Sequence, residues 1–565
     1  MIAADAPSSS RSKGWWGIVA VTAVAAGIRF YGLDRRQLWL DENCTFYWAR
    51  HFFNWPADGP QPWYEPAHLP YFFLLHGWCK IVGDSAWGLR SFSALIGTLT
   101  VPLLSYLAFR LAGRRAAITT AILAALHPLH VYYSQEARSY SLWIFITTIN
   151  ILLLLLAANS RKIIWWIVYV CAAWLAVLTH FCSLFWIPGS LAVIFLSLTP
   201  RLFLKRWIIA HILLGLMLIP VYWWCLRPYL GTGAADWQHS MWLNIPPHMA
   251  IPKSLWSLLP SGDYPSAYLA PLAASLDYQI LLPSRIPRMG PAILLCAIAL
   301  ACLYPFRSKK KIQIDRRVQG DLLIQNLSRP FVALAIFSLS FLAISWIASF
   351  ILGRGYLVAR YDFAAWPSFI LALVLLLEIF AHRFQAVTAR RFSPLPITAF
   401  LAGCSAITCL GLHRLPVQND ILDRASRIAA QVQPEDLLIS LNIYRWFLEH
   451  EWEKIGFKTR ILSFPSAHDR QFCWQNAEDE LRHPDRLSSD ASHLANEVEA
   501  TLQAHHNVWL ISHGQPVGAR WNADQILFQE LRGRGISIEL QNEWIGLAVL
   551  GRRQERPIGP SSQRP

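Results

Sequence analysis

Long apolar segments occupy most of the first 413 residues of this sequence, and they restrict it to one class of fold. A helix needs about 20 apolar residues to cross roughly 30 Å of hydrocarbon at about 1.5 Å per residue. Because 54% of the 565 residues are hydrophobic, the sequence predicts a polytopic, all-α membrane protein with about 11 transmembrane helices. The predicted spans are 14–33, 90–112, 116–133, 141–158, 163–179, 184–199, 207–226, 290–306, 330–352, 363–382 and 394–412.

The basic residues indicate how these spans are oriented. The net charge of +15 raises the alternative of nucleic-acid binding, but the excess lies in residues 1–413, which hold 33 Lys and Arg against 15 Asp and Glu. With the N-terminus in the cytoplasm, the short segments facing the cytoplasm hold 19 basic residues. This asymmetry follows the positive-inside rule, so the basicity indicates topology and not a nucleic-acid partner. The cytoplasmic segments are the tail 1–13, 113–115, 159–162, 200–206, 307–329 and 383–391.

Two large loops are predicted on the external side of the membrane domain, which covers residues 14–413. They comprise residues 34–89 and 227–289, and both are rich in Trp and Pro. Aromatic density of this kind is typical of residues that lie among lipid headgroups. Within the first loop, residues 69–82 predict an amphipathic helix at the membrane interface. The first span is too long for the apolar core of a signal peptide, so we expect it to remain uncleaved.

Hydropathy falls after the last span, and charges of both signs interleave. Residues 414–565 hold 17 Lys and Arg against 20 Asp and Glu. Short apolar runs alternate there with segments of helical periodicity, which predicts a small soluble α/β domain on the extracytoplasmic side. It shows neither a glycine-rich phosphate loop nor cysteines and histidines at metal-binding spacing. The predicted strands are Asp436–Asn442, Asn507–Ser512 and Ile536–Leu540, and the predicted helices are Tyr444–Lys454, Ala495–Ala504 and Ala523–Arg532.

Two adjacent carboxylates, Asp41 and Glu42, follow the first span directly. Charge at the edge of a bilayer is costly to bury, so an acidic pair there indicates a function. A base acting on a lipid-linked substrate belongs at such a position. The alternative is that Asp41 caps an interfacial helix that runs through residues 44–53.

Further polar residues are predicted to lie on the same side of the membrane. Arginine presents a planar fork of donors suited to phosphate oxygens, but Arg138 can instead reach lipid headgroups or pair with Glu136. Histidines in these loops can bind a metal or can simply be hydrogen-bonded. The candidates for phosphate or substrate binding are Gln135, Glu136, Arg138, Tyr140, Arg360 and Tyr361, and those for a divalent cation are Glu65, His68 and His180.

These motifs resemble a known family. Residues 39–42 resemble the first-loop acidic motif of family 39 glycosyltransferases. This family belongs to the GT-C superfamily and includes protein O-mannosyltransferases and bacterial lipid A aminoarabinose transferases. Residues 127–140 are similar to the bacterial members' stretch P-x-H-x-x-Y-S-Q-E-A-R-x-Y. Residues 83–95 resemble their second-span entry, while 179–181 and Arg360-Tyr361 are similar to later landmarks.

The resemblance covers roughly residues 38–375 and is strongest over 38–140. One segment departs from the pattern, because residues 65–71 read Glu-Pro-Ala-His-Leu-Pro-Tyr where members carry a Pro-Pro-Leu-Tyr-like run. The C-terminal residues 414–565 are not diagnostic.

The resemblance implies an enzyme, a hexosyl or pentosyl transferase that takes a sugar from a polyprenyl phosphate on the extracytoplasmic face of the bacterial inner membrane. It implies that Asp41 acts as base for an acceptor hydroxyl in a single inverting displacement, with Glu42 orienting Asp41 or helping to hold a divalent cation. Arg138 and Arg360 would neutralise the leaving phosphate. The implied partners are the polyprenyl-phosphate sugar, membrane lipids and a glycan, lipid or protein acceptor.

Two other classes of function remain open at the level of sequence. A multi-pass transporter would place charges and broken helices near the middle of the membrane. Here Glu378 is the only acid deep within an apolar run, and it lies near the cytoplasmic end of that run. An envelope-assembly or sensor protein would instead use residues 414–565 to bind a partner, and Asp41 would then be dispensable.

Overall fold

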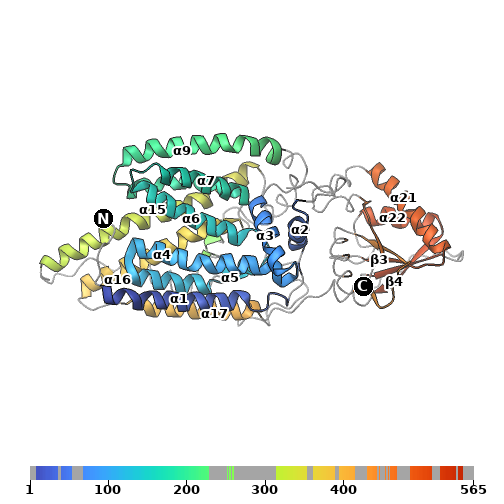
Figure 1. Cartoon of the computed structure of the whole chain (residues 1–565), viewed down its shortest axis with the longest axis horizontal. Helices are drawn as coiled ribbons and strands as arrows, with labels where there is room; N and C mark the ends of the chain where they lie inside the picture. The colour runs from blue at the N-terminus through green and yellow to red at the C-terminus, as the bar shows by residue number, and fades with distance from the viewer. Residues whose placement is uncertain are drawn as a thin grey trace, which may run out of the picture. The chain divides into compact units, whose positions relative to one another are not determined.

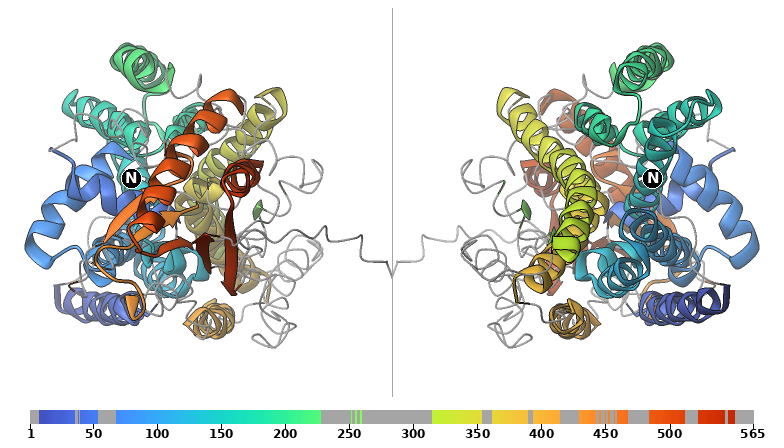
Figure 2. Two further views of the ribbon diagram at one scale, coloured as in Figure 1. Left: turned by 90° about the vertical axis from the view of Figure 1, so that its right-hand side faces the viewer. Right: turned by 90° about the vertical axis from the view of Figure 1, so that its left-hand side faces the viewer.

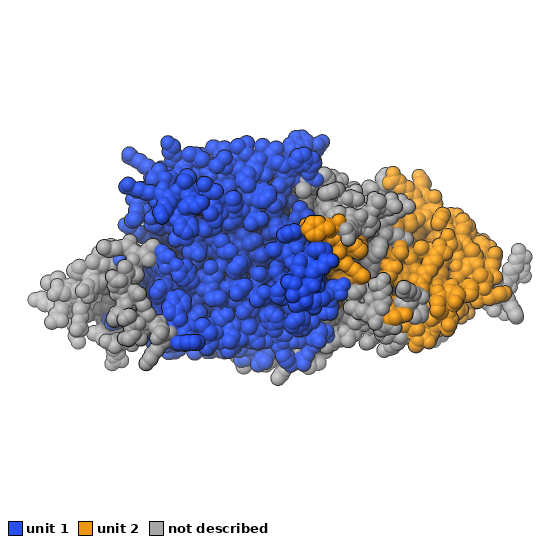
Figure 3. Space-filling view, viewed as in Figure 1, with its two compact units in different colours: residues 1–36, 65–227, 235–417 blue, residues 37–64, 228–234, 418–565 orange. Residues whose placement is uncertain are grey.

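The computed structural model divides the chain into two compact units, shown in Figure 3. Unit 1 comprises residues 1–36, 65–227 and 235–417, and unit 2 comprises residues 37–64, 228–234 and 418–565. Unit 2 thus includes part of the predicted first external loop. The structure describes residues 8–35, 38, 40–53, 68–227, 251, 254–255, 258–259, 314–352, 361–388, 393–413, 429–441, 445, 449, 452, 456, 459–466, 484–511, 522–542 and 545–550.

Unit 1 is a bundle of helices (Figure 1). Within the described residues, five helices are long and apolar enough to cross a membrane, which confirms the predicted polytopic, helical fold class. The elements are α1 (Ser8–Phe30), α3 (Leu69–Val82), α4 (Ala86–Leu126), α5 (Pro128–Ser134), α6 (Tyr140–Ala158), α7 (Ile164–Thr179), η2 (Phe181–Trp186), α8 (Ile187–Ser190), η3 (Leu191–Leu196), α9 (Pro200–Val221), η4 (Tyr222–Leu226), α15 (Ile314–Leu352), η5 (Asp362–Ala365), α16 (Trp366–Thr388) and α17 (Leu395–His413).

Helix α4 is a hairpin of two helical arms. Gly113 interrupts it with φ 83° and ψ −169°, a conformation that glycine adopts without steric cost. The Ser105 hydroxyl donates to the Ala117 carbonyl at 2.9 Å, although 12 residues of straight helix would separate these groups by about 18 Å. The arms correspond to two predicted spans, 90–112 and 116–133. The second arm stops at Leu126 because the residue before a proline avoids the α conformation, and Pro128 begins α5.

Other predicted spans differ from the structure. The span 184–199 is instead an irregular helical segment, made of η2, α8 and η3, which contains Pro188. It passes close to α15, since a Cβ on Gly189 would lie only 3.0 Å from the carbonyl oxygen of Phe337. Helix α15 starts at Ile314, within the predicted cytoplasmic segment, because a helix can continue beyond its apolar part. The span 290–306 lies outside the described residues.

The helices of unit 1 differ in how deeply they are packed. The apolar window of the segment Asp362–Gln385, which covers most of α16, is 83% buried, whereas that of Pro200–Trp224, which contains α9, is only 17% buried. Figure 2 shows α9 at the edge of the bundle. Exposed apolar side chains on α9 include Ile208, Ile212 and Leu216. A contiguous apolar face of this kind marks a surface that another apolar phase covers, and lipid suits a membrane protein.

Polar contacts join helices and turns at one end of unit 1. The Nε of Arg115, next to the Gly113 turn, donates to both carboxylate oxygens of Glu378 at 2.9 Å, and its Nη2 donates to the same carboxylate. The Ser197 hydroxyl donates to the Ala158 carbonyl at 3.1 Å. These are the turns that the positive-inside rule assigns to the cytoplasm. Glu378 lies near the middle of α16, and its carboxylate is paired with Arg115 beside the Gly113 turn.

Unit 2 contains a mixed five-stranded sheet, in the order β2-β1-β3-β5-β4. The three strands β2, β1 and β3 are parallel, and β5 is antiparallel to both β3 and β4. Leu437 pairs with Arg460 on one side and Val508 on the other. The elements are α2 (Leu40–Arg50), β1 (Leu437–Ser440), β2 (Arg460–Ser463), α21 (Pro484–Gln503), β3 (Val508–Ile511), α22 (Asn522–Gly533), β4 (Ile536–Asn542) and β5 (Ile545–Leu550).

The C-terminal α/β architecture is confirmed, with differences in detail. Strands β1, β3 and β4 lie where apolar runs predict them, but β2 and β5 were not predicted. Strand β2 has only four residues and starts at a charged arginine, so its pattern is weak. Strand β5 is a short apolar run that the sequence analysis overlooked. Helix α21 starts at Pro484, before the predicted Ala495, because proline suits the first turn of a helix. Most of the predicted helix 444–454 lies outside the described residues.

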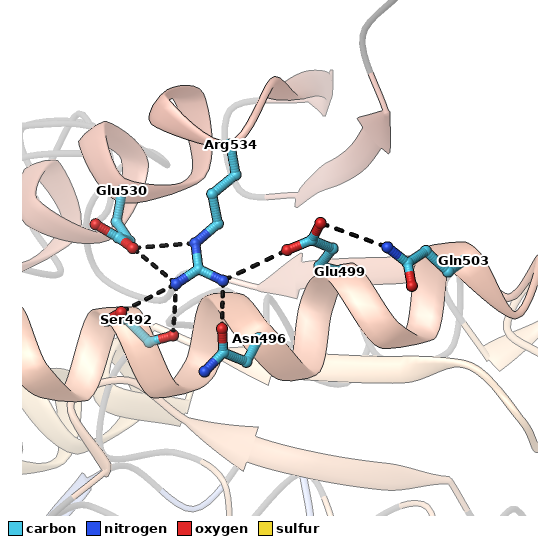
Figure 4. Close-up of polar contacts among 6 residues, drawn as sticks. All are labelled: Ser492, Asn496, Glu499, Gln503, Glu530 and Arg534. Carbon is cyan, nitrogen blue, oxygen red and sulfur yellow. Dashed lines mark hydrogen bonds and ion pairs between the residues drawn. The ribbon is translucent and has the colours of Figure 1, made fainter.

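Arg534 joins helices α21 and α22, as Figure 4 shows. It follows α22, and its Nε and Nη2 donate to the Glu530 carboxylate at 3.0 and 2.9 Å. The same Nη2 reaches the Ser492 hydroxyl of α21 at 2.9 Å, and Nη1 donates to the side chains of Asn496 and Glu499. One guanidinium thus satisfies acceptors on both helices.

Replacing Arg534 by alanine is therefore expected to lower the free energy of unfolding of unit 2 by about 1–3 kcal/mol, because several charge-assisted hydrogen bonds are lost together. Hydrogen exchange of residues 484–542 in the full-length protein measures this. Arg532, exposed in the last turn of α22, provides the control: Arg532→Ala should change exchange little. Equal effects of the two substitutions would contradict the linking role of Arg534.

Candidate functional site: a buried arginine and two histidines at one end of the helical unit

Four segments that are far apart in sequence meet at one end of unit 1. They are the start of α3, the turn between α5 and α6, the end of α7, and the residue before η5. The His68 backbone N–H donates to the Leu178 carbonyl at 3.0 Å. The imidazole of His180 lies with its ring centroid 5.7 Å from that of His68 and 5.0 Å from that of Tyr361. The structure thereby brings together candidates from all four segments.

Arg138 is buried in this cluster, with 5% of its surface exposed. Its Nη2 donates to Nε2 of His68 at 3.3 Å. Because arginine only donates, Nε2 must be the unprotonated nitrogen of a neutral imidazole. The proton then sits on Nδ1, which faces the Thr179 carbonyl at 3.1 Å and the Ser139 hydroxyl at 2.6 Å. One partner of the guanidinium is thus a neutral imidazole nitrogen.

The other candidates of the 135–140 turn have distinct surroundings. Glu136 is buried with 4% of its surface exposed. Tyr140 begins α6, and its ring packs against Tyr133 at 4.8 Å and His180 at 6.1 Å between centroids. His180 also stacks on Trp143 at 4.0 Å. The imidazole is therefore fixed within an aromatic cluster.

Gln135 serves the fold directly. Its amide nitrogen lies 3.1 Å, 3.2 Å and 3.1 Å from the carbonyl oxygens of Ile28, Arg29 and Tyr31, at the end of α1. The last carbonyls of a helix lack partners within the helix, so this side chain caps α1. It thereby ties the turn that carries Arg138 to the first span. The sequence predicted Gln135 as a candidate for phosphate or substrate binding, and the structure shows that its amide anchors this turn to α1.

His68, one of the predicted metal ligands, has other partners in this structure. Both of its ring nitrogens have hydrogen-bonding partners, and the positive guanidinium of Arg138 lies against Nε2. In His180, Nδ1 accepts the Cys182 backbone N–H at 3.3 Å. Within the described part of the chain, no group of three His, Cys, Asp or Glu residues is placed to hold a metal. Because Glu65, the third predicted ligand, lies outside the described residues, binding of a divalent cation stays a prediction. Arg360 also lies outside the described residues.

The acidic pair belongs to unit 2. Helix α2 begins at Leu40, so Asp41 and Glu42 lie in its first turn, where a negative charge is favoured by the helix dipole. Asp41 is partly exposed and its carbonyl accepts the Thr45 hydroxyl at 3.0 Å, whereas Glu42 is fully buried. Burial raises the pKa of Tyr47 to about 12. Asp41 is thus the accessible acid of α2.

Arg29 is a buried residue that the sequence analysis overlooked. It lies near the end of α1 with none of its surface exposed. Its Nη1 donates to the Ala125 carbonyl at 2.9 Å and its Nη2 to the Ala124 carbonyl at 3.1 Å, both at the end of α4. Nη2 also donates to Nδ1 of His130 on α5 at 2.9 Å. The sequence signal for Arg29 was its position within an apolar span, because charge inside the membrane normally has a specific function.

Comparison with known proteins identifies a family that matches part of this chain. Residues 66–224 match the model of a family described as Dolichyl-phosphate-mannose-protein mannosyltransferase. The family resemblance predicted from the sequence is confirmed. The matched segment contains His68, Arg138, Tyr140 and His180, which are the residues that the structure brings together. No curated protein matches the chain.

Solved structures share the fold. ArnT from Cupriavidus metallidurans bound to undecaprenyl phosphate is similar with a TM-score of 0.56 and 14% identity, covering 96% of this chain and 100% of that chain. The same protein in the apo state gives a TM-score of 0.43 and 13% identity over the same shares. At this identity the first likeness shows a common fold. The chain is therefore a multi-pass membrane protein that shares the fold of ArnT and, over residues 66–224, matches the mannosyltransferase family model.

Proposed function

We propose that this protein transfers a sugar from a polyprenyl phosphate to an acceptor hydroxyl on the extracytoplasmic face of the bacterial inner membrane. The observation that carries this proposal is the buried guanidinium of Arg138, held by a neutral imidazole within the segment that matches the family. A buried positive charge of this kind favours an anion such as a phosphate. The structure of similar fold was solved with undecaprenyl phosphate, which supports this class of donor.

The proposed reaction is one in-line displacement. Asp41 accepts the proton of the acceptor hydroxyl as its oxygen bonds to the anomeric carbon. The bond from that carbon to the phosphate oxygen breaks, and the phosphate leaves with the electron pair. Arg138, together with Arg360, stabilises the charge that develops on the phosphate. Attack opposite to the leaving group inverts the anomeric carbon.

The proposed orientation follows from the distribution of basic residues. The turn at Arg115 and the segments near Ser160 and Arg206 belong to the predicted cytoplasmic side, with the N-terminus. Arg138 and His68 lie on segments assigned to the opposite side. The lipid tail of the donor would lie among apolar helices, and the C-terminal domain would be extracytoplasmic. A glycan, a lipid or a protein can each supply the acceptor hydroxyl.

Cells that lack the protein test this function. Their glycans and lipids, analysed by mass spectrometry, should lose one sugar modification, and the wild-type gene should restore it. The purified protein should also bind undecaprenyl phosphate, the lipid that such a transfer releases. An unchanged set of glycans and lipids, with no binding of the lipid phosphate, would favour the transporter or assembly alternatives.

A further inference from the structure

His68 has a backbone conformation that side chains rarely adopt. Its φ is 84° and its ψ is 0°, in the left-handed region. Within the described residues, only His505 of unit 2 is another non-glycine residue with positive φ. Such strain persists where the surrounding contacts determine it, and it gathers at functional sites. His68 thus has a conformation that needs an explanation from its contacts.

Those contacts join three segments. The His68 backbone N–H donates to Leu178 at the end of α7, and its carbonyl accepts the Phe72 N–H in the first turn of α3, at 3.0 Å each. The ring inserts between the end of α7 and the turn before α6, where Nδ1 meets Thr179 and Ser139. The left-handed backbone therefore directs Nε2 at Arg138.

We propose that His68 is a positioning residue that aims the Arg138 guanidinium at the phosphate of a polyprenyl-phosphate donor, through its unprotonated Nε2. This inference rests on the proposed function. An arginine has several rotatable bonds, and ordering it on binding costs free energy. A neutral acceptor at Nε2 orders the guanidinium in advance and does not cancel its charge, as a carboxylate would. The imidazole thereby increases donor affinity without itself contacting the donor.

Two substitutions separate the effect of the hydrogen-bond acceptor at Nε2 from the effect of the left-handed backbone. The amide of His68→Asn occupies the place of Nδ1, where it can still donate to Thr179, and asparagine tolerates the left-handed region. It offers nothing at the position of Nε2. His68→Gln places a carbonyl oxygen near that position and restores an acceptor. The same change at an unrelated left-handed residue, His505→Asn, is the matched control.

The measurement is the Kd of the full-length protein for undecaprenyl phosphate. His68→Asn is expected to weaken binding about ten-fold, as the loss of one hydrogen bond to a charged group does. His68→Gln should recover most of the affinity, and His505→Asn should bind as the wild type does. Thermal unfolding of each variant shows whether it is folded. An unchanged Kd for His68→Asn, or no recovery with His68→Gln, overturns the inference.

A double variant tests whether His68 acts through Arg138. In an Arg138→Ala background, His68→Asn should cause no further loss of affinity, because the guanidinium that it aims is absent. The same ten-fold loss in both backgrounds would overturn the positioning role and would indicate a purely structural histidine. Wild-type protein that binds no undecaprenyl phosphate would instead contradict the proposed function. If the wild type and Arg138→Ala differ in affinity but His68→Asn does not differ from the wild type, this inference alone fails.

Discussion

Substitution of Asp41 by asparagine is expected to reduce sugar transfer by about a hundred- to ten-thousand-fold, because the acceptor hydroxyl then has no base in place. Asparagine is nearly the same size as aspartate but cannot accept the proton. Asp41 lies in the first turn of α2 and is partly exposed, so the substitution should leave folding and membrane insertion intact. The assay is mass spectrometry of glycans and lipids from deletion cells that express the variant.

A nearby aspartate offers a matched control for this experiment. Asp34 is exposed and lies only seven residues before Asp41 in the sequence, and Asp34→Asn should support full transfer. Donor binding gives a second control, since Asp41→Asn should still bind undecaprenyl phosphate. Full transfer by folded Asp41→Asn protein would remove the base from the mechanism and would favour the assembly alternative, in which this residue is dispensable.

The helices of unit 1 could largely be predicted because hydropathy is a local property. Helices α6, α7 and α17 begin and end within one residue of the predicted spans 141–158, 163–179 and 394–412. Irregular helices were harder to predict, because their conformation depends on what they pack against. The segment 181–196 has an apolar composition that suits a regular helix. Where it passes close to α15, it instead forms two 3-10 helices joined by a short α-helix.

Candidate residues could be found from sequence, but their partners could not. Residue type and predicted side of the membrane single out His68, Arg138 and His180. The contact between His68 and Arg138 joins residues 70 positions apart, and no periodicity encodes such a pair. For the same reason the sequence did not predict the partners of His68 in the fold, which are an arginine, a serine and a carbonyl.

Substitution of Arg138 by alanine is expected to weaken the binding of undecaprenyl phosphate about a hundred-fold, a cost typical of removing one member of a buried charged contact. Arg138 has 5% of its surface exposed, so little water could replace the hydrogen bonds that a phosphate would lose. Arg138→Lys should give an intermediate affinity, because an ammonium keeps the charge but lacks the planar fork.

The control for this substitution is Arg201, which is exposed at the start of α9. Arg201→Ala removes the same charge from the predicted cytoplasmic side and should leave the affinity for the lipid phosphate unchanged. Raising the salt concentration should weaken wild-type binding only modestly, because a buried charge is poorly screened. Equal affinity of wild-type and Arg138→Ala protein would show that another cation holds the phosphate. The buried guanidinium would then serve the packing of α3, α6 and α7.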